Sequence, residues 1–148
     1  MGLLNYSTQI PVHKTLSEIQ YILVSHGAKK IMYDYGEGGT INELCFSVIT
    51  PYGEKGVRLP AKVDATLKVL HQQKKERKIK GTVDREQAAR VAWRIIKDWV
   101  ELQMALLETE QAEFCELFFP YLLDNTGKNT LYEVYKQKQL PAGGEIND

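Results

Sequence analysis

Residues 86–108 read EQAARVAWRIIKDWVELQMALLE, a stretch without Gly or Pro in which most of the circumference of a helix is apolar. A helix this apolar needs burial on most of its sides, so we expect it to form the centre of the core. The apolar period resumes after an acidic turn, which predicts one continuous rod over residues 85–118 that Pro120 ends or kinks. Opposite charges recur four residues apart along one strip of this helix, in Glu86–Arg90, Arg94–Asp98 and Lys97–Glu101.

Before the long helix, the sequence predicts a strand and then a short helix. Apolar and polar residues alternate over residues 6–12, which is the period of a strand. Thr15 and Glu18 have the spacing of a capping box, in which the side chain of each residue accepts the backbone N–H of the other. An amphipathic helix is therefore expected to start at Thr15 and to end at Gly27, which readily adopts the left-handed conformation.

Residues 30–59 show the pattern of three strands joined by two turns. Period-two alternation recurs on both sides of the Gly-rich turn GEGGT, residues 36–40, and again after the turn TPYGEKG, residues 50–56. Pro60 stands where the first turn of a helix tolerates proline, so a second helix is expected from there to about His71.

Two further capping boxes locate the remaining helices. Asp84 and Gln87 predict the start of the long helix, and Thr130 and Glu133 predict a short C-terminal helix. The resulting order is β-α-β-β-β-α followed by the long and the short helix, and it places an antiparallel sheet against helices in an α+β fold. We expect a single domain over residues 1–140 and a flexible tail over residues 141–148.

The charges are balanced over the whole chain but divided along it. Lys and Arg together number 19, as do Asp and Glu, which excludes a generally basic protein of the histone kind. Residues 62–85 hold eight basic and three acidic residues, whereas residues 86–124 hold three basic and eight acidic residues. The chain is therefore expected to be dipolar, with its positive charge centred on a polar segment between two helices.

This basic stretch predicts a nucleic-acid-binding surface, because Lys and Arg neutralise phosphates without reading a base sequence. Tyr33, Tyr35 and Tyr52 are candidates for stacking on exposed bases. Two alternatives stay open: the segment is only a solvated loop, or it complements the acidic patch 108–116 of a neighbouring subunit. The candidate phosphate contacts are Lys74, Lys75, Arg77, Lys78, Lys80 and Arg58.

Arg90 and Arg94 on the long helix have two interpretations. Their oppositely charged neighbours four residues away favour a solvated face of a structural helix. Alternatively, the packed helix holds both guanidinium groups as a clamp for an anionic group, such as a small nucleotide.

Catalysis is poorly supported by the sequence. His13, His26 and His71 have no acidic or cysteine partner at a spacing typical of a catalytic or metal site. Cys45 and Cys115 are expected to be reduced core thiols. No enzyme, cofactor or metal signature is present, so we expect a non-enzymatic protein without a cofactor. Since no secretory signal or apolar run of membrane-spanning length occurs, a soluble cytoplasmic protein is expected.

Several segments together carry a resemblance to a known family. They are NYSTQIPVHKTLSEIQYILVSHGAKKIMYDY, RLPA, EQAARVAWRIIKDWVELQMALLE, FFPYLL and TLYEVY. In combination they resemble a family of small uncharacterised proteins carried by bacteriophages and prophages, over nearly the whole chain to residue 135. The resemblance implies a genomic setting and no particular activity.

Two kinds of function are consistent with these observations. The first is a phage accessory protein that associates with nucleic acid through the basic segment. The second is a protein-interaction module, which either inhibits a host defence protein or forms a homodimer through the long apolar helix. A homo-oligomeric sponge for a small anionic ligand, with Arg90 and Arg94 as the clamp, is a variant of the second.

Overall fold

The computed structural model describes residues 1–142 and confirms the α+β class. One sheet of three antiparallel strands, in the order β1-β2-β3, is preceded and followed in the chain by helices. The elements before the long helix are α1 (Val12–Ser25), β1 (Ala28–Tyr35), the 3-10 turn η1 (Glu37–Gly39), β2 (Ile41–Thr50), β3 (Gly53–Pro60) and α2 (Val63–Lys75). The later elements are α3 (Arg85–Glu108), α4 (Phe114–Phe118), the 3-10 turn η2 (Phe119–Tyr121) and α5 (Leu131–Ala142).

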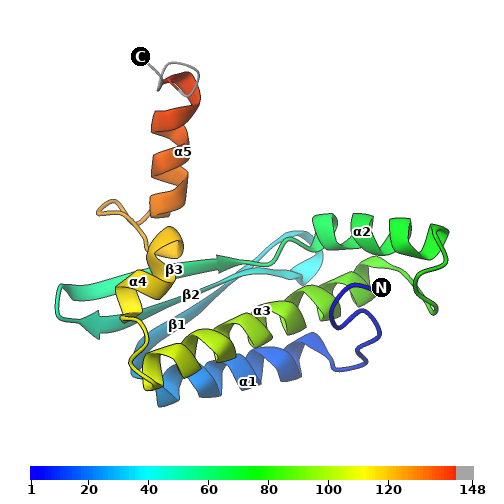
Figure 1. The fold of residues 1–148 in the computed structure, drawn as a ribbon, viewed down its shortest axis with the longest axis horizontal. Coiled ribbons are helices and arrows are strands. Elements are labelled where there is room, and N and C mark those ends of the chain that lie inside the picture. Colours follow the sequence, from blue (N-terminus) through cyan, green and yellow to red (C-terminus); the bar gives the residue numbers. More distant parts are fainter. Residues whose placement is uncertain (143–148) are drawn as a thin grey trace.

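The helices are arranged around α3. α1 and α3 lie side by side, run in the same direction and cover one face of the sheet (Figure 1). α2 packs on the first half of α3 and extends beyond the sheet at one end of the molecule, whereas α5 points away from the body (Figure 1). The Leu123 N–H donates to the Gly56 carbonyl at 2.8 Å, which places the segment before α5 along the outer edge of β3.

The core has two parts, and α3 contributes to both. The larger part lies between the sheet and the two parallel helices, and its largest fully buried side chains include Trp93 and Phe118. Trp93 also donates its indole N–H to the Ile41 carbonyl at 3.3 Å, so its one polar atom is satisfied. The smaller part joins α2 and the loop after it to α3 through Leu70, Ile79 and Val91. Burial of each large side chain stabilises the fold by about 1.5–3 kcal/mol, which is why an apolar helix such as α3 organises the domain.

The expectation of one rod over residues 85–118 is wrong, because α3 ends at Glu108. Glu110 adopts the left-handed conformation with φ 56°, and its N–H donates to the Leu107 carbonyl at 3.1 Å. The next N–H, that of Gln111, donates to the Leu106 carbonyl at 3.0 Å. This is the Schellman pattern that closes helix C-termini, built here without its usual Gly. α4 therefore starts a new direction at Phe114.

The strand expected over residues 6–12 is also wrong. The segment forms turns, and the backbone carbonyls of Tyr6 and Thr8 accept hydrogen bonds from the Gln87 side-chain amide at 3.0 and 2.9 Å. Pro11 is the N-cap of α1 and its carbonyl accepts the Thr15 N–H at 3.2 Å. The segment is thus satisfied by α3 and by α1, not by a neighbouring strand.

Two helix starts differ from the expectation for related reasons. α1 begins one turn before Thr15, whose side chain is fully buried, so the Thr15–Glu18 capping box is not formed. Pro60 is the last residue of β3, and α2 runs from Val63 past His71 to Lys75. In both places the tertiary contacts outweigh the local capping or proline signal.

The other turn and cap predictions are confirmed. Gly27 follows α1 with φ 95°, and the three-stranded meander has the expected two turns. The Asp84 side chain accepts the Gln87 N–H at 2.8 Å at the start of α3. Thr130 and Glu133 form both halves of their capping box, at 2.7 and 3.1 Å. Of the tail expected over residues 141–148, residues 141–142 belong to α5 and residues 143–148 lie outside the described part.

Candidate functional site

The basic segment, residues 74–80, is the end of α2 and the turn that follows it. Arg77 takes the left-handed conformation with φ 62°, which reverses the chain after the helix. Ile79 then packs into the smaller core with 5% of its surface exposed, and the Lys78 N–H donates to the Gln73 carbonyl at 2.9 Å. The backbone of the segment is therefore held in place while its charged side chains stand in solvent. The exposed cations are Lys74, Lys75, Arg77, Lys78 and Lys80.

Two of these cations already interact with acceptors in or next to the basic segment. Lys78 pairs with Glu76 at 3.2 Å, and the Lys74 ammonium donates to the Gly81 carbonyl. Hydrogen bonds from Gln72 and Lys78 hold the pKa of Glu76 below its usual value, so this carboxylate stays charged beside them. Among residues 1–142, the ion pairs of the structure include none with Lys75, Arg77 or Lys80. These three cations are the part of the segment that is available to an external anion.

Arg58, the sixth candidate for phosphate contact, lies elsewhere. It projects from β3 and interacts with Glu43 at 3.5 Å, Glu133 at 3.2 Å and the Lys128 carbonyl at 2.9 Å. Glu133 and Lys128 belong to α5 and to the loop before it, and α5 lies well apart from the end of α2 (Figure 1). The structure therefore does not bring Arg58 to the basic segment; the residue joins α5 to the sheet.

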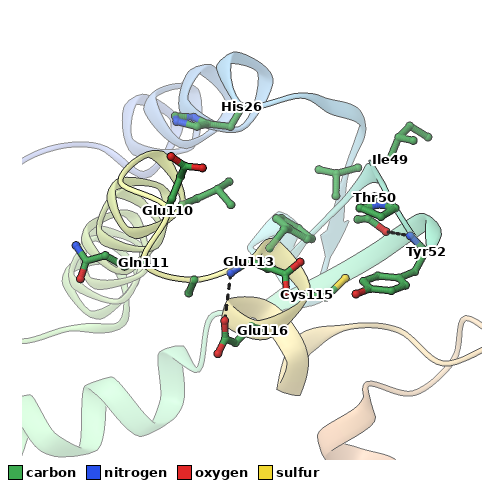
Figure 2. Close-up of a pocket in the computed structure, with 14 residues that line it drawn as sticks. His26, Ile49, Thr50, Tyr52, Glu110, Gln111, Glu113, Cys115 and Glu116 are labelled. Carbon is green, nitrogen blue, oxygen red and sulfur yellow. Dashed lines mark hydrogen bonds between the residues drawn. The ribbon is translucent and has the colours of Figure 1, made fainter.

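The tyrosines are not gathered at the basic segment either. Tyr33 donates its hydroxyl to Gln20 at 2.8 Å, on the side of the sheet that faces α1. Tyr52 is exposed at the turn between β2 and β3, which is the opposite end of the molecule from α2 (Figures 1 and 2). Tyr35 is exposed at the last position of β1. The basic segment therefore has neither Tyr33 nor Tyr52 beside it.

Arg90 and Arg94 contact other parts of the fold. Arg94 is 13% exposed and its guanidinium donates to Glu18 on α1 at 3.0 Å. Arg90 donates to the side chains of Gln87 at 2.8 Å and Glu86 at 3.4 Å. The Glu86–Arg90 and Lys97–Glu101 pairs expected from the sequence are formed, whereas Arg94 pairs across to α1. This geometry favours a structural role for Arg94 over a ligand clamp.

A second charged site lies at the far end of α3, and we call it the acidic groove. It is a hollow of about 590 Å³ between the C-terminal ends of α1 and α3, the β2–β3 hairpin and the start of α4 (Figure 2). Its acidic side chains are Glu110, Glu113 and Glu116, all exposed. Its apolar lining includes Val48, Ile49, Leu107 and Phe114. In the described part of the chain, the lining contains no Lys or Arg, so the hollow combines negative charge with apolar surface.

His26 lines this groove and pairs with Glu108 at its edge. The two ring nitrogens of His26 face acceptors: Nδ1 lies 2.8 Å from the Ile22 carbonyl and Nε2 lies 2.6 Å from Glu108 Oε1. Both bonds can be donated only by the doubly protonated ring. The Ile22 carbonyl, helped by Glu108, therefore raises the pKa of His26 against the opposing effect of burial. The pair joins the ends of α1 and α3 at the edge of the groove.

The thiols occupy different surroundings and form no disulfide. Cys115 contributes to the lining of the acidic groove (Figure 2). Cys45 lies on the outer face of β2, and burial raises the pKa of its thiol, which keeps the unreactive protonated form. Both are half-buried, so the expectation of core thiols holds only in part.

The basic segment and the acidic patch 108–116 were both predicted from the sequence, but the groove that this patch lines was not. In the sequence, the groove is indicated only by the run of Glu residues around Phe114. Its other walls come from His26 and the β2–β3 hairpin, which are distant in sequence. Residues 1–142 contain no cluster of His, Cys, Asp and Glu that could hold a metal ion. Over the same residues, every helix is too short or too polar to cross a bilayer.

Comparisons of the chain with protein-family models, with curated proteins and with solved structures found no match.

Proposed function

We propose that this protein is a non-enzymatic phage or prophage accessory protein that associates with nucleic acid through its basic segment, in the cytoplasm of the host cell. The observation that carries the proposal is a group of three cations that have no ion pair within residues 1–142, on a turn anchored by the buried Ile79: Lys75, Arg77 and Lys80. A fixed backbone limits the conformational entropy that binding costs, because only side chains need to be ordered.

The surroundings of the segment support binding to a phosphate backbone. The outward side of α2 adds Lys68 near Lys75, so the positive surface continues along the helix. The carboxylates of the acidic groove lie beyond the other end of α3, whose 24 residues give it a length of about 36 Å, well over the roughly 8 Å over which charges act at physiological salt. The contacts available are to phosphates, so the proposed binding does not depend on base sequence.

Fluorescence anisotropy with a labelled duplex and a labelled single strand tests the proposal. Neutralisation of about three phosphates gives a log–log salt slope of about −2.7, so the affinity for duplex falls about 40-fold between about 50 mM and about 200 mM salt. The triple variant Lys75→Gln, Arg77→Gln and Lys80→Gln is expected to lose at least about tenfold in affinity at the lower salt and most of the slope.

The matched control removes the same charge elsewhere. The control variant carries Lys29→Gln, Lys55→Gln and Lys128→Gln. These three lysines lie on the strands and in the loop before α5, away from α2. This control should keep most of the wild-type affinity. No binding by the wild-type protein at about 50 mM salt, or an equal loss in both triple variants, contradicts the proposal.

A further inference from the structure

We propose that the acidic groove of one copy binds the basic segment of a second copy, so that the protein associates head to tail. The two surfaces lie at opposite ends of the long axis of the molecule, with α2 at one end and the junction of α3 and α4 at the other (Figure 1). A single copy cannot bring them together, whereas two copies placed end to end can.

Charge complementarity is the first support for this partner. The groove carries Glu110, Glu113 and Glu116, with Glu108 beside them, and its lining within the described residues has only His26 as a possible cation. The basic segment supplies three cations that pair with no carboxylate of the described part of the chain. It lies in the stretch 62–85, which has an excess of five positive charges, eight less three. Each contact between copies would therefore place opposite charges against each other.

Apolar complementarity is the second support. The groove exposes Ile49 and is lined by Leu107 and Phe114. A partner that fits it must therefore offer apolar surface as well as positive charge. The basic end carries an apolar side chain of its own, Leu4, which is 60% exposed. Leu4 lies beside the segment because the preceding Leu3 N–H donates to Gln73 of α2 at 2.8 Å. The aliphatic stems of the lysines can cover the remaining apolar lining while their ammonium groups reach the carboxylates.

The two surfaces differ from each other, so the contact is heterologous. A pair of copies keeps one unused groove at one end and one unused basic segment at the other, and association therefore continues along a chain of copies unless the geometry closes a ring. Contacts between exposed charges contribute little individually, so we expect weak association that is lost as salt screens it. The same basic segment also serves the proposed function, but self-association is measured without nucleic acid, so the two proposals fail independently.

Sedimentation velocity and light scattering of paired charge-reversal variants test the inference. The acid-reversed variant carries Glu110→Lys and Glu113→Lys, and the base-reversed variant carries Lys75→Glu and Lys80→Glu. At about 50 mM salt the wild-type protein should show a mass that rises with concentration and returns to that of one copy above about 0.5 M salt. Each variant alone should lose association, and an equimolar mixture should regain it, because one variant then has two basic ends and the other two acidic ends.

Controls separate this result from damage to the fold. Lys128→Glu with Lys136→Glu makes the same charge change as the base-reversed variant in α5 and the loop before it, and should associate like the wild type. If the acid-reversed variant does not fold, Glu110→Gln with Glu113→Gln replaces it and should weaken association about tenfold. A wild-type mass of one copy at low salt and high concentration overturns the inference. So does a mixture that stays monomeric, or association that survives in either folded variant.

Discussion

His26 links the C-terminal ends of α1 and α3 through both nitrogens of its ring. Its pKa is raised in the folded protein, so the folded state holds this proton more tightly than the unfolded state does. The stabilisation is fully present below the unfolded pKa and is lost as the pH rises through the higher folded pKa. We therefore expect the free energy of unfolding to fall as the pH rises above the ordinary histidine pKa of 6.5, apart from the effects of other groups.

Urea unfolding of Glu108→Gln at a series of pH values on both sides of this point checks the prediction. The amide keeps a similar shape but lacks the charge that helps to hold the proton on His26, so the variant should show a smaller fall in stability. His71→Gln is the control, since it removes a histidine at an exposed position on α2, away from the end of α3. The pH dependence should change more in Glu108→Gln than in this control. An identical pH dependence in the wild type and in Glu108→Gln would contradict the role given to the pair.

At the scale of elements, the end of α3 stores backbone strain in one residue. Glu110 has a left-handed φ of 56° at the position of the Schellman motif where Gly is usual. Glu110→Gly should therefore stabilise the protein by about 0.5–1 kcal/mol. This is the energy that a non-Gly residue spends in the left-handed conformation, minus the larger conformational entropy that Gly loses on folding. In thermal unfolding, the midpoint temperature should rise by about 2–4 °C for each kcal/mol of added stability.

Glu110→Ala is the control for loss of the carboxylate, because Ala removes the charge and keeps the strain. If both variants have the same midpoint as each other, the left-handed strain is no larger than the entropic cost of Gly, which contradicts the prediction. The expected order of stability at low salt is Glu110→Gly above Glu110→Ala, with the difference unchanged in high salt.

The elements that the sequence predicted correctly are those with a local cause. The meander follows from alternation and Gly turns, and the α5 start follows from the reciprocal Thr130–Glu133 bonds, which need no distant partner. The errors arose where a distant residue decided the outcome. Thr15 is buried within α1 instead of capping it, and Glu18 pairs with Arg94 of α3. The break after Glu108 was missed because a Glu, not a Gly, takes the left-handed position.

At the scale of the whole molecule, the sequence predicted that basic and acidic residues are separated along the chain, but not which surfaces of the fold carry them. The basic segment is contiguous in the chain, so counting Lys and Arg was enough to locate it. The acidic groove combines the ends of α1 and α3 with the β2–β3 hairpin, and only the packing of parallel helices on the sheet brings these together. Arg58 shows the converse: its charge suggested a binding role, while the fold uses it to hold α5 through Glu133.

The two proposed uses of the basic segment cannot both be satisfied in one copy at one time. A segment that lies in the acidic groove of a neighbour has its cations on carboxylates, so they are not available to phosphates. A short duplex added to the associated protein at about 50 mM salt should therefore break the chains of copies and lower the mass of the protein species.

Sedimentation velocity with separate absorbance signals for protein and labelled duplex measures this competition. The protein should move from long assemblies to small complexes with the duplex as the duplex concentration rises, and the base-reversed variant, which neither associates nor binds, should not respond. Inorganic phosphate at the same ionic strength serves as the control for screening, because it lacks the closely spaced charges that release counterions on binding. If duplex binds while the assemblies keep their mass, the segment is not shared, and one of its two proposed partners contacts a different surface.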